Sequence, residues 1–166
     1  MNHRSMLGDA METLHLEALQ KEVLQQEVGA IAQRVSNNPE VSSRYVALLD
    51  EIERGEITSE CSGTLEGILD VLLESGRARH LYGPPGEHTL TALFQRTPRG
   101  AALVQQSQVL TRSLSGLEGQ MLSNLSVRSS GPSAWAFTLQ TDRCELTLQI
   151  DRRGVQIKSV DMDLGA

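Results

Sequence analysis

The spacing of apolar residues changes once along the chain, near Gly119, and this change constrains the fold more than any other feature of the sequence. Before Gly119, apolar side chains recur every three or four residues, as they do on one side of an α-helix. After Gly119 they recur every second residue, which is typical of half-buried antiparallel strands. The two patterns are segregated, so the sequence predicts an α+β fold in which about five helices precede one antiparallel sheet.

Local signals divide the first part of the chain into helices. The first predicted helix runs from Ala10 to Val35 and contains one Gly and no Pro. Asn38 and Pro39 are typical of a helix start, and Gly55 is typical of a helix end. The remaining predicted helices run from Thr58 or Thr64 to Glu74, from Glu87 to Gln95 and from Thr97 to Leu117. We expect residues 77–86, which contain Gly-Pro-Pro-Gly, to form a connector.

The last 45 or so residues are expected to form a four-stranded meander that packs on the preceding helix. Alternating segments begin at Leu125, Trp135, Leu146 and Val155, and the breaks between them have the length of hairpin turns. In the last segment the apolar phase shifts between Ile157 and Val160, which predicts either a β-bulge near Ser159 or an edge strand that leaves the sheet.

Charge is distributed unevenly over the chain, whose formal net charge is −6. Residues 1–80 carry 7 basic and 14 acidic side chains, and residues 81–166 carry 8 basic and 7 acidic ones. We therefore predict an acidic helical region over 1–80, which is a candidate oligomerisation arm, and a helix-plus-sheet domain over 81–166. Alternatively, the two regions pack together as one compact unit. The acidic balance disfavours duplex nucleic acid as a partner.

The sequence contains none of the residue spacings that catalytic or metal sites usually leave. Cys61 and Cys144 are far apart, which fits a reducing compartment, and there is no C-x-x-C, paired-histidine, G-x-S-x-G or Walker pattern. No apolar run has the length of a signal peptide core or a membrane span. We therefore expect a cytoplasmic protein that is not an enzyme, holds no metal or cofactor and makes no membrane contact.

The apolar stripe of the first predicted helix is wide, and a wide stripe requires partners on more than one side. This favours a protein-interaction module, such as an adaptor, regulator or assembly factor, that forms homodimers and binds a further protein. The residues expected at the interface are Leu14, Leu16, Leu19, Val23, Leu24, Val28 and Ile31.

Two alternative functions remain open at this point. In the first, Trp135 and Phe137 line a pocket for a small apolar ligand between the sheet and helix 97–117. In the second, arginines contact an anion or a nucleic acid backbone; the candidates are Arg77, Arg79, Arg96, Arg99, Arg128, Arg143, Arg152 and Arg153. Aromatic residues make up only 3% of the chain, so recognition of bases by stacking is disfavoured.

Overall fold

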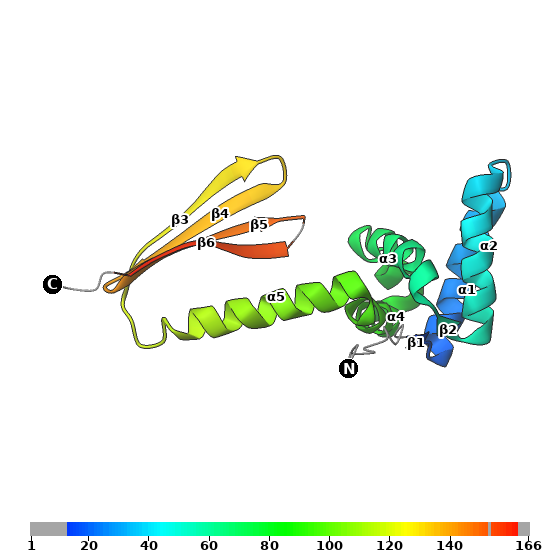
Figure 1. The fold of residues 1–166 in the computed structure, drawn as a ribbon, viewed down its shortest axis with the longest axis horizontal. Coiled ribbons are helices and arrows are strands. Elements are labelled where there is room, and N and C mark those ends of the chain that lie inside the picture. The colour runs from blue at the N-terminus through cyan, green and yellow to red at the C-terminus, as the bar shows by residue number, and fades with distance from the viewer. Residues whose placement is uncertain (1–12, 153, 163–166) are drawn as a thin grey trace, which may run out of the picture. The chain divides into compact units, whose positions relative to one another are not determined.

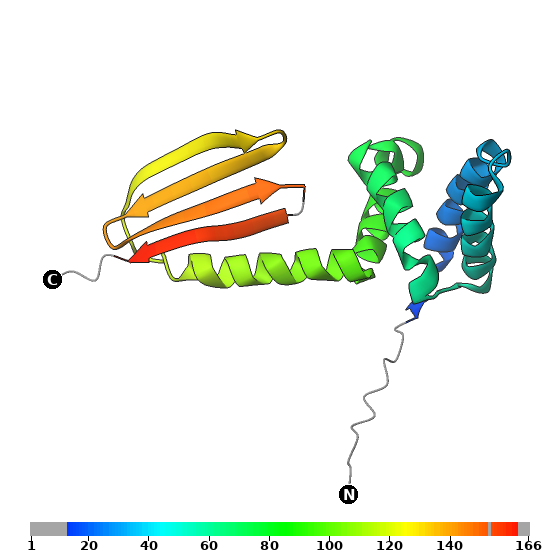
Figure 2. The same cartoon turned by 45° about the horizontal axis from the view of Figure 1, so that its top comes forward.

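The structure is a computed structural model that describes residues 13–152 and 154–162. The chain divides into two compact units, residues 1–101 and 102–166, which we call the helical unit and the sheet unit (Figures 1 and 2). The boundary that charge suggests, at residue 80, falls inside a helix of the helical unit. The observed division lies near the start of the last helix. All of the net charge of −6 belongs to the helical unit, with 9 basic and 15 acidic residues, because the sheet unit carries 6 of each.

The helical unit is built from helices and one very short sheet (Figure 1). In chain order its elements are β1 (Leu14–His15), α1 (Ala18–Arg34), α2 (Pro39–Arg54), β2 (Glu56–Ile57), α3 (Ser59–Glu74), α4 (Arg77–Arg96) and the first turn of α5 (Pro98–Ser115).

The capping signals around α2 and α3 act as the sequence predicts. The Asn38 side chain accepts a hydrogen bond from the Val41 amide at 3.3 Å, and Pro39 occupies the first helical position, where its missing N–H is not needed. Gly55 ends α2 in the left-handed conformation with φ of 81°, which a residue with a Cβ adopts at a cost. The third predicted helix is confirmed as α3, with its start after Thr58.

The predicted start of the first helix is wrong. The helix α1 begins at Ala18, and the residues before it form β1, whose Leu14 and His15 pair with Ile57 and Glu56 of β2. Glu17 caps α1 in a reciprocal capping box with Gln20. Residues 10–12 of the predicted helix lie outside the described residues.

The predicted connector over residues 77–86 is also wrong, because this segment belongs to α4. Helical backbone breaks only at Gly83, whose φ of 66° and ψ of −175° are not helical. Pro84 and Pro85 follow the break directly, so they occupy the first positions of the second half of α4. Proline is tolerated there because those N–H groups have no helical acceptor.

The helical unit has one aliphatic core to which every helix from α1 to α4 contributes. Its fully buried side chains are Val23, Leu24, Val28, Leu48, Ile52, Ile57, Leu65, Leu69, Leu90 and Leu93. Aromatic residues only pack against the edge of this core, as Tyr45, Tyr82 and Phe94 do.

The sheet unit confirms the α+β prediction and the meander. Its strands are β3 (Leu122–Gly131), β4 (Ala134–Thr141), β5 (Cys144–Asp151) and β6 (Gly154–Met162), all antiparallel and in the order β3-β4-β5-β6. Thr147 pairs with Ser159 but Leu148 pairs with Ile157, which leaves Lys158 as an extra residue in β6. The predicted bulge is therefore confirmed.

The register separates an apolar face of the sheet from a polar face. Two cross-strand rows form the centre of the apolar face: Leu125, Leu139, Leu146 and Val160; and Val127, Phe137, Leu148 and Ile157. On the other face a row of hydroxyl side chains consists of Ser126, Thr138, Thr147 and Ser159. Directly opposed residues share a face, so these rows fix the orientation of every strand.

The helix α5 runs along the sheet on the side of β6, while β3 is the outermost strand on the other side (Figure 2). Leu146 and Leu148 of β5 are buried, whereas every residue of β3 before Gly131 is exposed. Cover over the apolar face is therefore most complete at β5, partial at Phe137 and Leu139 of β4 and at Ile157 of β6, and lacking at β3 and at Val160.

Within the described residues, no helix combines the length and the apolar character that crossing a membrane requires.

Candidate functional site

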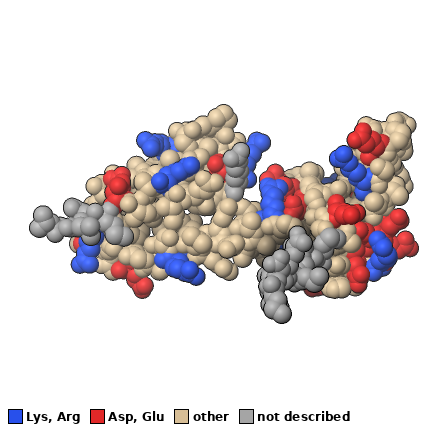
Figure 3. All heavy atoms as spheres, in the orientation of Figure 1, with Lys and Arg blue, Asp and Glu red and all other residues tan. Residues whose placement is uncertain are grey.

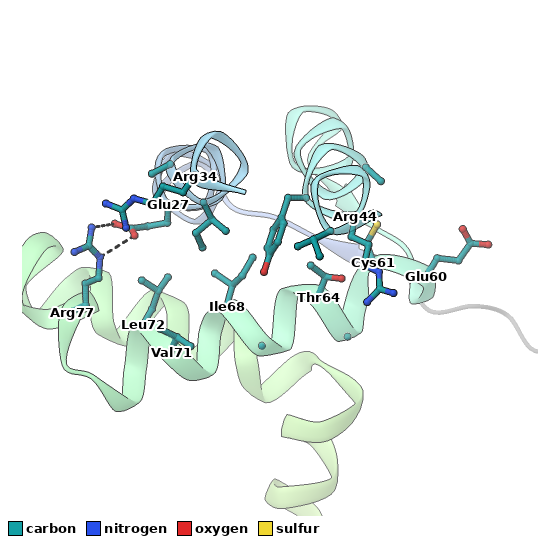
Figure 4. A pocket seen from close by; sticks show the side chains of 17 residues that line it. Glu27, Arg34, Arg44, Glu60, Cys61, Thr64, Ile68, Val71, Leu72 and Arg77 are labelled. Carbon is teal, nitrogen blue, oxygen red and sulfur yellow. Dashed lines mark hydrogen bonds and ion pairs between the residues drawn. The ribbon is translucent and has the colours of Figure 1, made fainter. Parts of the chain in front are cut away.

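An open groove of about 950 Å³ lies between the α1–α2 pair and α3 in the helical unit (Figure 4). The side chains in Figure 4 reach into it from α1, α2 and α3, and Arg77 at the start of α4 stands at one end. Its apolar lining includes Ala30, Ile31, Val41, Tyr45, Ala47, Ile68, Val71 and Leu72.

The α3 side of the groove combines apolar side chains with two glycines. Val71 is 64% exposed, although it is a large aliphatic residue on a helix whose other leucine and isoleucine side chains are mostly buried. Gly63 and Gly67 are four residues apart and therefore share one face of α3. A Cβ at either glycine would meet no atom within 4 Å, so no residue in the described part of the chain occupies the space beside them. The glycines leave a depression that runs along the helix.

The rim of the groove carries more basic than acidic side chains. Arg34, Arg44 and Arg77 line it together with Glu27 and Glu60 (Figure 4). Glu27 is already engaged by Arg77, so its charge is compensated within the chain. Arg44 forms an ion pair with Glu40 at 3.6 Å, but both side chains are largely exposed, and exposed ion pairs contribute little free energy.

Glu27 is the best-organised polar group of the site. Its carboxylate accepts hydrogen bonds from Arg77 Nε at 3.0 Å, Arg77 Nη2 at 3.3 Å and the Tyr82 hydroxyl at 2.7 Å. Burial raises the pKa of Glu27, but the hydrogen bonds from Arg77 and Tyr82 outweigh it and lower the pKa below its ordinary value. Burial and the bond to Glu27 raise the pKa of Tyr82 to about 12. This network ties α1 to the first half of α4.

Cys61, which also lines the groove, is held in its thiol form. Burial, and then the nearby charge of Glu51, raise the pKa of the Cys61 thiol to about 11. The thiol is therefore protonated at neutral pH, and the thiolate is the reactive form. Glu51 is buried because it accepts bonds from the Thr58 amide at 2.8 Å and the Thr58 hydroxyl at 2.7 Å, where α3 begins. The negative carboxylate is favourable at a helix N-terminus.

The residues predicted as an oligomer interface are packed inside the helical unit. Leu14, Val23, Leu24 and Val28 belong to its core, and Leu16 and Ile31 pack against that core. Only Leu19 is exposed, at 39%. The wide stripe of α1 finds its partners in α2 and α4 of the same chain, so this stripe does not offer an open surface to a second copy. Self-association itself stays a prediction.

The predicted ligand pocket between Trp135 and helix 97–117 is not lined as expected. Trp135 lies on the apolar face of the sheet, but its side chain is 51% exposed. Phe137 is half-buried in the neighbouring row. The two rings share a face, as the alternation predicts, but the larger one lies in the open rather than in an enclosed space.

The predicted arginine contacts fall into two groups. Four of them bind groups of the helical unit: Arg77 pairs with Glu27, Arg79 with Glu87, Arg99 with Asp70, and Arg96 donates to the His15 carbonyl. Arg128, Arg143 and Arg152 of the sheet unit are exposed and form no ion pair within the described part of the chain. Arg153 lies outside the described residues.

The exposed arginines of the sheet unit do not form one basic surface. Arg143 is in the β4–β5 turn, whereas Arg152 is in the β5–β6 turn at the opposite end of the strands. Figure 3 shows the basic side chains of this unit as separate groups. A continuous basic track is the usual footprint of a protein that follows a nucleic acid backbone, and the described arginines do not make one.

Among the described residues, no three His, Cys, Asp or Glu side chains gather as a metal site would require. The groove itself was not predicted from the sequence. Its one signal in the sequence was the spacing of Gly63 and Gly67 inside the amphipathic helix α3, because glycine weakens a helix and, within one, often has a packing reason.

No protein-family model, curated protein or solved structure matches the chain, so the case for a function depends on the groove and the two units themselves.

Proposed function

We propose that the helical unit is a non-enzymatic protein-interaction module that binds one amphipathic helix of a protein partner in its groove. The observation that carries this proposal is the combination of exposed Val71 with the open space beside Gly63 and Gly67 on α3. Amphipathic helices bind by laying their apolar face into a groove of this kind. Small residues on the receiving helix let the two backbones approach closely.

The size of the groove fits a helix of a few turns. The helix α3, which forms one wall, has 16 residues and so is about 24 Å long. A bound helix of similar length offers about four turns, which present apolar anchors at every third or fourth position.

The charge of the rim favours a partner helix with an acidic polar face. Arg34 lines the groove and acts on Glu27 only through its charge, since Glu27 is already paired with Arg77, and Arg44 pairs only with the exposed Glu40. Charges at a rim contribute mainly to specificity, so we expect Arg34 and Arg44 to select acidic partner helices over basic ones.

A fluorescence anisotropy titration tests this proposal. The probe is a labelled synthetic peptide of about four helical turns with leucines on one face and glutamates on the other. We expect the intact chain to bind it, and the Gly67→Leu variant to bind it more weakly by on the order of tenfold, because the new side chain fills the groove.

Gly29→Leu is the matched control. Gly29 is also a helical glycine with open space at its Cβ, but it does not line the groove. This variant should bind the peptide like the unmodified chain, and a peptide with lysines in place of the glutamates should bind weakly. Equal loss of binding in both glycine variants, or no binding of the acidic peptide by the intact chain, would contradict the proposal.

A further inference from the structure

The sheet unit buries few of the apolar side chains that its strands carry. Among its described residues the buried apolar side chains are Ala136, Leu146 and Leu148, although both rows of the apolar face run across all four strands. Leu122, Leu125, Val127 and Trp135 are each more than half exposed and lie at the β3–β4 end of that face. A cluster of exposed large apolar side chains on one surface is typical of an interaction site.

The two edges of the sheet differ in how well they are protected against pairing. The β6 edge carries the bulge at Lys158, and a bulge and charged side chains are the usual devices that prevent edge-to-edge association. The β3 edge also has register shifts, between Leu122 and Asn124 and between Ser129 and Gly131, but it is regular over the six residues from Asn124 to Ser129, and all of these are exposed. Arg128 is the only charged residue in β3. The longest regular stretch on either edge is therefore residues 124–129 of β3, because the bulge divides β6 into two stretches of four residues.

The sequence of β3 is compatible with itself when two copies run antiparallel. Residues that oppose each other across an antiparallel pair share a face, so a two-fold axis at Ser126 sets Leu125 opposite Val127 of the second copy. The same register sets Arg128 opposite Asn124, so no like charges meet. It also joins the apolar faces of the two sheets into one continuous surface.

The net charge of the sheet unit favours a second copy of the chain as the partner that binds the β3 edge. The sheet unit has 6 basic and 6 acidic residues, so two such units do not repel each other. The helical unit holds all of the net charge of −6, which disfavours association of two helical units with one another.

We propose that the chain forms a two-fold homodimer in which the β3 strands of two copies pair antiparallel about Ser126 and build one eight-stranded sheet. This inference goes beyond the proposed function, because it uses a different surface and a different partner. It replaces α1, whose apolar side chains are packed within the chain, by β3 as the site of self-association.

Sedimentation equilibrium of the full chain, with charge variants at Ser126, tests the pairing. In the proposed register the two Ser126 side chains are directly opposite, so Ser126→Asp brings two carboxylates together and Ser126→Lys brings two ammonium groups together. Each variant alone should dimerise more weakly by on the order of tenfold. An equimolar mixture of the two should regain dimers, because the opposite charges then face each other.

Ser159→Asp is the matched control, because Ser159 belongs to the same cross-strand row but lies on the β6 edge. It should dimerise like the unmodified chain. The proposal is overturned if the unmodified chain is a monomer at every concentration the optics can measure, or if Ser126→Asp leaves the dimer unchanged. It is also overturned if the mixture of Ser126 variants does not regain dimers, or if Ser159→Asp weakens the dimer equally.

Discussion

At the scale of single residues, Glu27 shows how one buried acid joins parts of the chain that are far apart in sequence. Its hydrogen-bond donors, Arg77 and Tyr82, are 50 and 55 residues away. A buried carboxylate is costly without such donors, because it loses its water. The network therefore makes the orientation of α1 against α4 specific, and with it the shape of one end of the groove.

Replacing Glu27 tests this role. The pKa of Glu27 is lowered in the folded chain, so its contribution to stability is complete above its ordinary pKa, near 4.5, and is lost as the pH falls through the lower folded value. We expect Glu27→Gln to lower the free energy of unfolding at neutral pH by about 2 kcal/mol, the scale of hydrogen bonds to a charged group.

Urea unfolding at a series of pH values measures both effects. The difference in unfolding free energy between the unmodified chain and Glu27→Gln should shrink as the pH is lowered below about 4.5. Glu22→Gln, at an exposed position of the same helix, should change stability by less than about 0.5 kcal/mol at neutral pH. A difference that does not vary with pH would show that the charge of Glu27 is not what stabilises the fold.

At the scale of secondary-structure elements, the corner between α4 and α5 depends on Gly100. A Cβ at this position would lie 1.8 Å from the carbonyl oxygen of Phe94, which is backbone and cannot rotate away. Gly100→Ala should therefore destabilise the helical unit by about 1–3 kcal/mol, as overpacking usually does. Thermal unfolding followed by circular dichroism measures the loss.

Gly63→Ala provides the comparison for this corner. A Cβ at Gly63 meets no atom within 4 Å, so alanine there should stabilise α3 by about 0.5–1 kcal/mol through its higher helix propensity. If both substitutions shifted stability in the same direction, the close approach at Gly100 would not be the controlling factor.

The elements that the sequence predicted well are those with a local signal at both ends. Asn38, Pro39 and Gly55 bound α2 in the sequence as they do in the structure. The alternation of apolar and polar residues along β3 to β6 is also a local signal, because successive side chains of any one strand point to opposite faces of the sheet. Even the bulge at Lys158 was visible as a change of phase.

What the sequence could not predict depends on partners that are distant along the chain. Leu14 and His15 form a strand only because β2 brings Ile57 beside them. Gly83 breaks α4 at one residue, but the helical conformation on both sides of Gly-Pro-Pro-Gly depends on packing, since Gly86 and Leu90 are buried. The groove likewise exists only where α1, α2 and α3 meet.

At the scale of the whole molecule, the two units differ in how much core they contain. The helical unit buries a cluster of fifteen apolar side chains, whereas three are buried in the described part of the sheet unit. Small domains with little interior are marginally stable unless something else supports them. We therefore expect the sheet unit to unfold first.

The single tryptophan allows this order of unfolding to be measured. Trp135 lies in the sheet unit, so its fluorescence reports that unit alone, while helical circular dichroism reports mainly the helical unit. The fluorescence transition should occur at lower urea concentration, and its midpoint should rise with protein concentration if the sheet unit is stabilised by self-association. Coincident transitions at all protein concentrations would contradict a weaker sheet unit.

The extra residue at Lys158 also decides what kind of assembly this sheet can enter. A sheet with two regular edges polymerises, because each added copy presents a fresh edge to the next one. If two copies pair at β3 as proposed, the distorted β6 strands form both outer edges of the joined sheet, and addition of a further copy is disfavoured there. Under the proposed pairing, the bulge at Lys158 would therefore favour a closed dimer over an open-ended filament.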